Sequence, residues 1–258
     1  MAVAVSIIGL ERIGLIKPGD DLSRIILESA TSENIQVADN DVIVISQKIV
    51  SKAEGQLVNI EEIKPGRRAR AYSEKAKKDP RLVELILRDT SRVLRAERRA
   101  FVVRRKDGLV CLNAGVDKSN VDGKKTYTLL PKNSDHSAQA LRSSLQRLTG
   151  KQLSVIVTDT YSRPSRVGQA EFAIGIAGIE PIVDYRGKKD LFGYELRYKY
   201  VGLADEVAAA AELVKGQGTE GIPVAIVRGL PRLTRTEEKD LSKKLLIGRQ
   251  TDLFTRLV

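Results

Sequence analysis

Three short runs of aliphatic and β-branched residues constrain the fold of this chain more than any other feature. They are DVIVISQKIV at 41–50, LSVIVTDT at 153–160 and IPVAIVRGL at 222–230. Short runs rich in Val and Ile that stop at polar residues or glycines are typical of buried strands. Amphipathic helical patterns lie between them, most clearly at 203–215. Strands mixed with helices in this way predict an α/β or mixed α+β fold with mixed sheets.

The other segments predict further elements but no break between domains. Residues 3–9 predict a strand, 67–100 a pair of helices broken at Pro80, and 101–116 a hairpin that turns at Asp107-Gly108. The sequence contains no internal repeat, low-complexity tract or linker-like change of composition. We therefore expect one domain over residues 1–258.

The chain has one histidine, His136, and one cysteine, Cys111. One cysteine cannot form an internal disulfide, and zinc sites ordinarily take several Cys or His ligands. A Ser-His-Asp or Cys-His mechanism would have to use the one imidazole, and no G-x-S-x-G motif lies near it. Any catalytic metal is therefore expected to be a hard cation with oxygen ligands, such as Mg²⁺ or Mn²⁺.

The formal net charge of the chain is +11. Such an excess suits a nucleic-acid-binding protein, and equally an enzyme that attracts anionic small molecules. The basic residues look dispersed, and no aromatic-plus-basic motif for single strands accompanies them, which favours the small-molecule interpretation and no nucleic-acid partner. The apolar start AVAVSIIGL lacks the features of a signal peptide, and no run reaches the roughly 20 apolar residues of a membrane span. We expect a cytoplasmic protein that does not bind a membrane.

Two acidic motifs are candidates for a metal site. In CLNAGVDKSN (111–120) a strand is followed by an Ala-Gly step and then by Asp117 and Asn120. In VIVTDTYSRPSRVGQ (155–169) an apolar strand ends in Asp159 and Thr160, with arginines after them. Acidic side chains at the carboxyl ends of strands commonly hold ligands and metals in α/β folds. The alternative for each aspartate is that it caps a turn.

A glycine-rich segment, VKGQGTEGIP (214–223), is the candidate for phosphate binding. Its glycines follow a predicted helix and precede a predicted strand, which is the reverse of the order in a dinucleotide-binding fingerprint. Glycine backbone can still surround phosphates, although a helix C-cap at Gly216 explains the first glycine without a ligand. Lys48 and Lys52, one helical turn apart, are either further phosphate-binding groups or solvated side chains.

Taken together, these stretches resemble the coenzyme F420-0:L-glutamate ligase family, the γ-glutamyl ligases of deazaflavin coenzyme synthesis. The resemblance spans nearly the whole chain, and its ordered motifs include IKPGDDL, VISQKIVSKAEG, NAGVDKSN, VIVTDTYSRPSR, ADEVAAAAELVKGQ and IPVAIVRGL. It implies a GTP-dependent ligase that activates the carboxylate of the deazaflavin precursor as an acyl phosphate and joins L-glutamate to it, in many members followed by a second, γ-linked glutamate. It also implies two Mg²⁺ or Mn²⁺ sites, stimulation by K⁺, and an intertwined α/β homodimer.

The resemblance also assigns roles to individual positions. Asp117 and Asp159, the catalytic candidates, match ligands of one metal, and Thr160 and Gln217 match ligands of the second. The arginines at 163 and 166 are candidates for holding substrate phosphate or carboxylate. The positions that match GTP contacts are Gly9, Leu10, Glu11, Ser46, Gln47, Lys52, Asn120, Lys215, Gly216, Gln217, Gly218, Thr219, Glu220, Gly221 and Ile222.

The chain departs from the family pattern at Tyr161-Ser162 and at Ser165, where other residues are frequent in the family, and Gln217 stands where some members have an acid. These departures motivate a second hypothesis, a ligase of the same fold that acts on another carboxylate or amino acid. A third hypothesis, from charge alone, is a nucleic-acid-binding protein without enzymatic activity.

Overall fold

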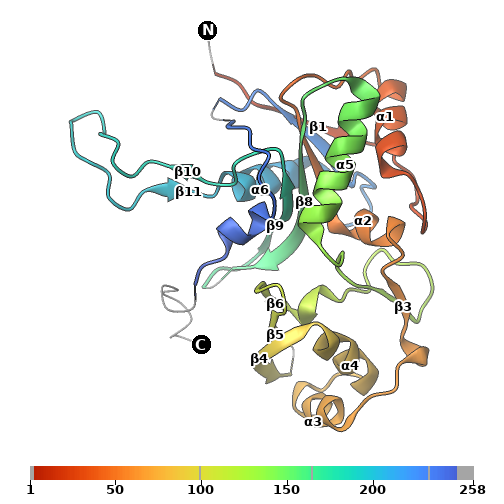
Figure 1. The fold of residues 1–258 in the computed structure, drawn as a ribbon. Coiled ribbons are helices and arrows are strands. Elements are labelled where there is room, and N and C mark those ends of the chain that lie inside the picture. Colours follow the sequence, from red (N-terminus) through yellow and green to blue (C-terminus); the bar gives the residue numbers. More distant parts are fainter. Residues whose placement is uncertain (1–2, 99, 164, 232, 249–258) are drawn as a thin grey trace. The chain divides into compact units, whose positions relative to one another are not determined.

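The computed structural model describes residues 3–98, 100–163, 165–231 and 233–248. The chain divides into two compact units (Figure 1). The first unit comprises residues 1–50 and 133–245, and the second comprises 51–132 with 246–258. The single domain expected over 1–258 therefore contains two units. Within the described residues, no helix is long and apolar enough to cross a membrane.

The first unit is built on a five-stranded sheet in the order β1-β12-β2-β8-β9. The three runs that led the sequence argument form its centre, and their strand residues are almost all buried. The strand expected over 41–50 is wrong beyond Ser46, because residues 47–50 begin the helix α2. The sheet is mixed as expected, because β2 pairs in parallel with β8 while every other pairing is antiparallel. Its strands are β1 (Ser6–Leu10), β2 (Val42–Ser46), β8 (Ser154–Ser162), β9 (Gln169–Ala177) and β12 (Val224–Arg228).

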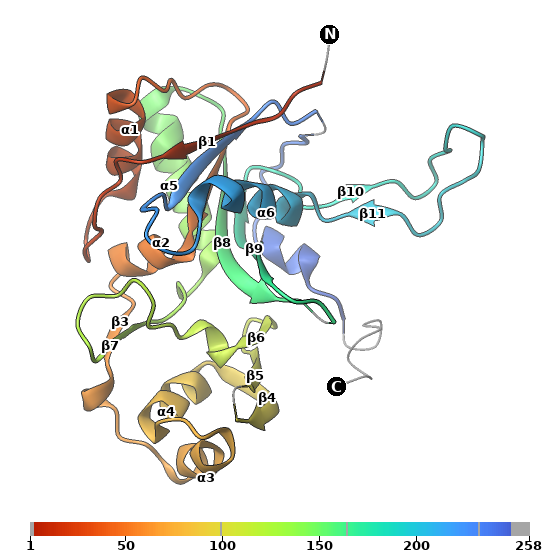
Figure 2. The same ribbon diagram turned by 180° about the vertical axis from the view of Figure 1, so that it is seen from behind.

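Helices cover both faces of this sheet. α5 (Ser134–Thr149) packs on β8 and β9 and lies in front of the sheet in Figure 1, with α1 (Leu22–Ser32) beside it. α6 (Leu203–Lys215) packs on β1, β9 and β12, and lies in front when the molecule is turned (Figure 2). Alanines at its sheet-facing positions bring α6 close to the core residues of β2, β8 and β12. The 203–215 helix is thus confirmed over its whole predicted length.

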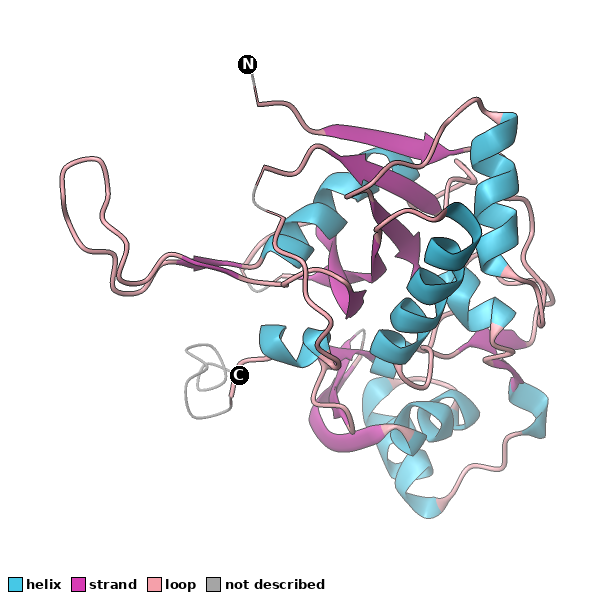
Figure 3. Ribbon diagram, turned by 45° about the horizontal axis from the view of Figure 1, so that its top comes forward, coloured by secondary structure: helices cyan, strands magenta, loops and turns pink. Residues whose placement is uncertain are grey.

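A long hairpin arm projects from the first unit between β9 and α6 (Figure 3). Only its base is regular, where β10 (Val183–Asp184) pairs with β11 (Tyr200–Val201). Its tip is nonetheless ordered by hydrogen bonds, because the Asp190 carboxylate accepts from the backbone N–H groups of Phe192 and Tyr194 at 2.8 and 2.9 Å. Leu191 and Phe192 at that tip are 99% and 96% exposed.

The second unit packs two helices and two small sheets around a core centred on Phe101. Tyr72 meets the Phe101 ring edge-on at a centroid distance of 5.8 Å. Short helical turns lie at Ile60–Glu62 and Asn113–Gly115 in this unit, and at Leu241–Leu245 in the first unit. The helix α2 (Gln47–Ala53) begins in the first unit and ends in the second. The elements of the second unit are β3 (Leu57–Asn59), α3 (Arg67–Ala76), α4 (Pro80–Arg88), β4 (Thr90–Glu97), β5 (Ala100–Arg105), β6 (Val110–Leu112) and β7 (Thr126–Thr128).

The helical prediction for 67–100 is correct only as far as Arg88. Pro80 does separate two helices, and it does so as the first residue of α4, with Asp79 as the N-cap. Beyond Arg88 the Thr90 hydroxyl donates to the carbonyl of Ile86 at 2.6 Å, and residues 90–97 then pair with β5 as a strand. Tertiary pairing has overridden the local helix preference of this Arg- and Leu-containing segment. The hairpin predicted at Asp107-Gly108 is confirmed by the pairing of β5 with β6.

Candidate functional site

The sheet of the first unit brings many of the predicted site residues to one edge. β1, β2 and β8 run in the same direction, because β12 is antiparallel to both β1 and β2, and β2 is parallel to β8. Leu10 pairs with Val224, and Ser46 pairs with Thr158. The carboxyl ends of three strands therefore meet the start of β12, where α/β folds commonly bind ligands. Along this edge lie 9–11, 46–47, 159–160 and the glycine segment 216–222.

Close backbone contacts hold this edge together. A Cβ atom on Gly9 would lie 2.8 Å from Ile222 Cγ2, so the end of β1 must be glycine for the glycine segment to pack on it. The Ser46 N–H donates to the carbonyl of Pro223 at 2.9 Å and fixes the end of β2 to the same segment. The side chain of Gln47, the next residue, is buried.

The N-terminal part of the edge already contains an anion from the chain itself. The Glu33 carboxylate accepts from the N–H groups of Glu11 and Arg12 at 3.1 and 3.0 Å. Burial would raise the pKa of Glu33, but these bonds and one from the Ser29 hydroxyl outweigh it and lower that pKa. The backbone after β1 is therefore arranged to bind negative charge.

The glycine segment shows the same preference for an anion. Gly216 (φ +64°) is the C-cap of α6, and its N–H donates to the carbonyl of Glu212 at 2.9 Å, which confirms the helix-cap interpretation of this glycine. The Gly218 N–H donates to the Glu220 carboxylate at 2.7 Å. A Cβ on Gly216 would lie 2.3 Å from Glu220 Cδ, so the carboxylate lies directly against glycine backbone. Phosphate oxygens are bound by backbone of this kind.

Asp159 and Thr160 were predicted to lie at the end of a strand. They lie instead within β8. The strand continues to Ser162, two residues beyond the expected limit, because it stays paired with β9 after β2 has stopped at Ser46. Neighbouring strand residues point to opposite faces of a sheet. Asp159 and Thr160, both half-buried, are therefore directed to different faces. Arg163 and Arg166 follow in the loop that joins β8 to β9.

Lys215, at the end of α6, is buried instead of facing solvent. Its Nζ contacts Glu171 Oε2 at 2.5 Å and Thr158 Oγ1 at 2.8 Å. Burial lowers the pKa of the ammonium group, while the carboxylates around it, Glu171 first, act in the opposite direction. A phosphate contact at this position would therefore come from the backbone and the glycines that follow, and not from the ammonium.

The second unit holds the other predicted residues: Lys52, Asp117 and Asn120. The Asp117 carboxylate accepts from the N–H groups of Lys118 and Ser119 at 2.6 and 2.9 Å and from the Ser119 hydroxyl at 2.6 Å. The turn-capping interpretation of Asp117 is thus correct, and it leaves the predicted metal role open. Its shared ion with Asp159, a residue of the first unit, stays a prediction.

A strained turn precedes Asp117. Asn113, Ala114 and Gly115 all have left-handed backbone, with φ of 51°, 55° and 74°. Such a conformation costs a non-glycine residue roughly 1–2 kcal/mol. Buried Arg105 stabilises the turn, because its Nη1 donates to the carbonyl of Ala114 at 2.9 Å while its guanidinium pairs with the carboxylates of Asp89 and Asp107.

Comparison with known proteins identifies the family. Residues 11–229 match the family model described as F420-0:Gamma-glutamyl ligase. The chain belongs to this family. It is 42% identical over 252 residues to the coenzyme F420:L-glutamate ligase of Methanothermobacter thermautotrophicus, covering 98% of this chain and 99% of the relative. The proteins of the same name from Methanopyrus kandleri and Archaeoglobus fulgidus are 42% and 38% identical, with 93% and 94% of this chain covered and 93% and 98% of theirs.

The residues of this chain fit the hard cations that the resemblance implies. Asp159, Thr160 and Gln217 offer carboxylate, hydroxyl and amide oxygens, the donors that Mg²⁺ and Mn²⁺ prefer. Gln217 donates its Nε2 to Glu212 at 2.7 Å, which turns its carbonyl oxygen the other way. Among the described residues, no three or more His, Cys, Asp and Glu side chains gather as a metal-binding group. A cation here would therefore take neutral oxygens or substrate phosphates as well as carboxylates.

Sequence reasoning about this ligase chain missed three acidic residues of the edge: Glu33, Glu171 and Glu212. Glu171 carried a usable signal, because it is an acid inside the otherwise apolar strand segment QAEFAIGIA and is only 3% exposed. A charge in such a run must be paired to be buried. Glu33 and Glu212 carried no signal, since each acts at the end of a helix through contacts with residues distant in the sequence.

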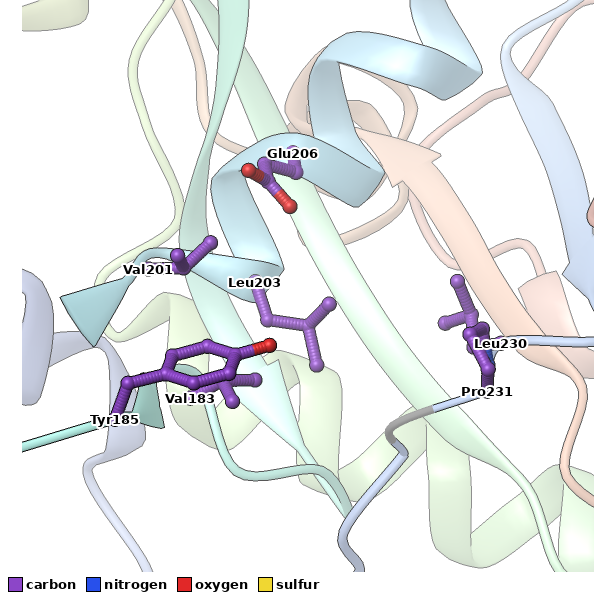
Figure 4. Close-up of a pocket in the computed structure, with 7 residues that line it drawn as sticks. All are labelled: Val183, Tyr185, Val201, Leu203, Glu206, Leu230 and Pro231. Carbon is purple, nitrogen blue, oxygen red and sulfur yellow. The ribbon is translucent and has the colours of Figure 1, made fainter. Parts of the chain in front are cut away.

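A cavity of about 240 Å³ lies elsewhere in the first unit (Figure 4). Valine, leucine and proline side chains line most of it, with the Tyr185 hydroxyl and the Glu206 carboxylate as its polar groups. Leu203 and Glu206 belong to the start of α6, whereas the glycine segment follows the end of that helix. The cavity therefore lies at the root of the arm and is separate from the strand ends that carry the predicted site.

Proposed function

We propose that this chain joins L-glutamate to the carboxylate of the deazaflavin precursor F420-0 at the expense of GTP. The observation that carries the proposal is the single sheet edge at which the predicted nucleotide, phosphate and metal residues of the first unit meet, in a chain that resembles coenzyme F420:L-glutamate ligases over nearly its whole length. GDP and phosphate are the expected by-products.

The chemistry suits what the chain contains. The precursor carboxylate attacks the γ-phosphorus of GTP, the bond to the β-phosphate oxygen breaks, and an acyl phosphate and GDP result. The glutamate amine then attacks the acyl carbon, inorganic phosphate leaves, and the amine loses a proton as the amide forms. Neither step needs a Ser, Cys or His nucleophile, because phosphoryl transfer depends mainly on positioning and on neutralising charge. One His and one Cys are therefore sufficient.

In this proposal each part of the site has a separate role. The N–H groups of the glycine segment and of residues 11–12, which now bind carboxylates, would bind phosphate oxygens. Two divalent cations, Mg²⁺ or Mn²⁺, would be held by Asp117 with Asp159 and by Thr160 with Gln217, and would neutralise the charge of the triphosphate. The alternation of Asp159 and Thr160 across β8 supports two separate ions. K⁺ is a further expected activator, and Arg163 and Arg166 are expected to hold the substrate.

The arm supports the homodimer that the resemblance implies. Five large side chains on it, Leu191, Phe192, Tyr194, Tyr198 and Tyr200, are between 54% and 99% exposed. Exposed large apolar side chains gathered on one segment in this way are typical of an interaction surface. Because bonds to Asp190 already order the tip, little further ordering is needed when it docks on a second copy.

The test is an incubation of the purified protein with GTP, Mn²⁺, L-glutamate and F420-0. We expect a product heavier by one glutamate residue, or by two if a γ-linked residue follows, and GDP release that requires both acceptor and glutamate. GDP release that is indifferent to both would contradict the proposal. Omitting Mn²⁺ and replacing GTP by ATP test the cation and the nucleotide.

A second candidate keeps the fold and changes the substrate. The Tyr161-Ser162 and Ser165 positions, at and after the end of β8, differ from the family pattern close to the predicted substrate arginines. Product formation from F420-0 with another amino acid in place of glutamate would favour this candidate. Glutamate-specific turnover would exclude it.

A further inference from the structure

The buried ion pair of Lys215 and Glu171 lies beneath the predicted metal-binding edge of the first unit. Their side chains are 1% and 4% exposed, and Nζ and Oε2 are 2.5 Å apart. The Thr158 hydroxyl joins them, since its Oγ1 lies 2.8 Å from both Lys215 Nζ and Glu171 Oε2. These three residues are called the Lys215 cluster below.

Burial distinguishes this pair from the other ion pairs that cross the first unit. Arg142 pairs with Glu237, and Arg228 with Asp41, but in each case one partner is exposed or partly exposed. Removing two charges from water costs as much as their attraction returns, and apolar replacements of similar volume often leave stability unchanged or raised. Stability alone therefore does not account for the Lys215–Glu171 pair.

The Lys215 cluster joins the elements that carry the predicted second cation site. Thr158 belongs to β8, Glu171 to β9, and Lys215 ends α6 directly before the glycine segment. In the strand register Glu171 lies opposite Thr160. A β-bulge between Val157 and Thr158 resets the register immediately before these residues.

A second chain of hydrogen bonds ends at the backbone N–H of Glu171. Gln217 donates its Nε2 to Glu212 Oε1 at 2.7 Å, and Glu212 Oε2 accepts from the backbone N–H of Glu171 at 2.9 Å. Thr160 is thus the cross-strand partner of Glu171. Gln217 is joined through Glu212 to the backbone N–H of Glu171, whose side chain is itself fixed by Lys215 and Thr158. The positions of both predicted ligands of one cation, Thr160 and Gln217, therefore depend on contacts with the buried residue Glu171.

We propose that Glu171 and Lys215 are positioning residues that set the spacing between Thr160 and Gln217 for a divalent cation. They touch neither cation nor nucleotide, and act by fixing the end of α6 to the β8–β9 ladder. This inference rests on the proposed metal-dependent function. Partners of metal ligands commonly contribute 10- to 100-fold in metal affinity, which sets the size of the expected effect.

The decisive variant replaces both charges, as Glu171→Met with Lys215→Met. Lys215→Met alone leaves a buried carboxylate unpaired, and its melting temperature should fall by roughly 10 °C. The double variant should regain most of that loss, because no buried charge remains. Its Mn²⁺ affinity with GDP present, read from the electron paramagnetic resonance signal of free Mn²⁺, should nevertheless stay about 10- to 100-fold below that of the unsubstituted protein.

Two further variants separate positioning from stability. Arg142→Met breaks an ion pair of the same unit that has no link to Thr160 or Gln217, so it should lower the melting temperature and leave Mn²⁺ affinity unchanged. Glu212→Ala, at a half-exposed position, should weaken Mn²⁺ binding with little change in melting temperature. It keeps the proposal testable if the double variant fails to fold.

Wild-type Mn²⁺ affinity in either the refolded double variant or Glu212→Ala would overturn the proposal and reduce the Lys215 cluster to a structural role. Absence of Mn²⁺ binding by the unsubstituted protein with GDP would overturn it as well. The ligase activity is judged separately, by the mass of the product. If the variants change Mn²⁺ affinity as expected but no glutamate-containing product forms, the proposed function is rejected and the metal-site inference is retained.

Discussion

The two units differ sharply in charge. Residues 1–50 and 133–245 contain 21 Lys and Arg and 21 Asp and Glu, whereas residues 51–132 contain 21 basic and 11 acidic residues. Residues 51–132 of the second unit therefore carry 10 of the 11 excess positive charges, and the one that remains comes from 246–258. The dispersal assumed from the sequence was wrong, because it was judged along the chain and not within the units.

The units also place their predicted aspartates by different physical means. Asp159 lies in a strand paired on β9, in a sheet covered on both faces, and its place follows from regular hydrogen bonding. Asp117 follows three left-handed residues whose conformation depends on Arg105 and on tight packing. We therefore expect the backbone at Asp117 to be more sensitive to substitution than the backbone at Asp159.

The largest expected effect comes from the two aspartates themselves. Asp159→Asn and Asp117→Asn should each lower kcat by at least about 100-fold, because removing a ligand costs more than removing a ligand's partner. Asn retains the oxygen that caps the turn at 117, so the melting temperature should stay close to that of the unsubstituted protein. The measurement is glutamate-dependent GDP release beside a thermal melt. Loss of activity in one variant alone would reject the ion shared between the two residues.

The next effect tests the strained turn. Gly115→Ala should destabilise the second unit by about 3 kcal/mol, because the added Cβ would lie 2.4 Å from Leu130 Cγ and φ is +74°. Gly55→Ala is the matched control: it has φ +68° and no heavy atom within 4 Å of the added Cβ, so its cost should be about 1 kcal/mol. Urea unfolding of both variants measures the difference. Equal losses would show that packing against Leu130 does not hold the turn.

The same contrast explains what the sequence could and could not predict. The strands at 42–46, 154–160 and 224–228 and the helix at 203–215 were predictable, because their period and composition are local properties. The edge common to 9–11, 46–47 and 216–222 follows from strand order, which no local pattern encodes. The strand at 90–97 and the pairing of Lys215 with Glu171 depend on long-range contacts, so only the structure revealed them.

A smaller effect tests the charge difference. Reversing three exposed cations of α3, in Arg67→Glu, Arg68→Glu and Lys75→Glu together, should lower kcat/KM for GTP about 10-fold at low salt, because these charges attract anionic substrates. The loss should shrink as salt screens the field. Arg147→Glu, Lys151→Glu and Lys239→Glu form the matched control in the first unit. An equal loss in both triple variants would mean that total charge matters and its location does not.

The smallest effect is expected in the acid range. The pKa of one carboxylate in the first unit is lowered there, and the pKa of one carboxylate in the second unit is raised. Hydrogen bonds lower the pKa of Glu33 despite its partial burial, so its contribution to stability is present above its unfolded pKa of about 4.3 and is lost as the pH falls through the lower folded value. Burial raises the pKa of Asp89, partly offset by Arg105, so stability instead increases as the pH falls through its folded value.

Melting temperatures between pH 3 and 7 therefore separate the two carboxylates. Glu33→Gln should flatten the decline of the first unit on acidification, and Asp89→Asn should remove the opposing gain of the second. Each substitution keeps the shape of the side chain and removes only its titration. If both variants steepened the acid decline, the opposite signs assigned to the pKa shifts of Glu33 and Asp89 would be wrong.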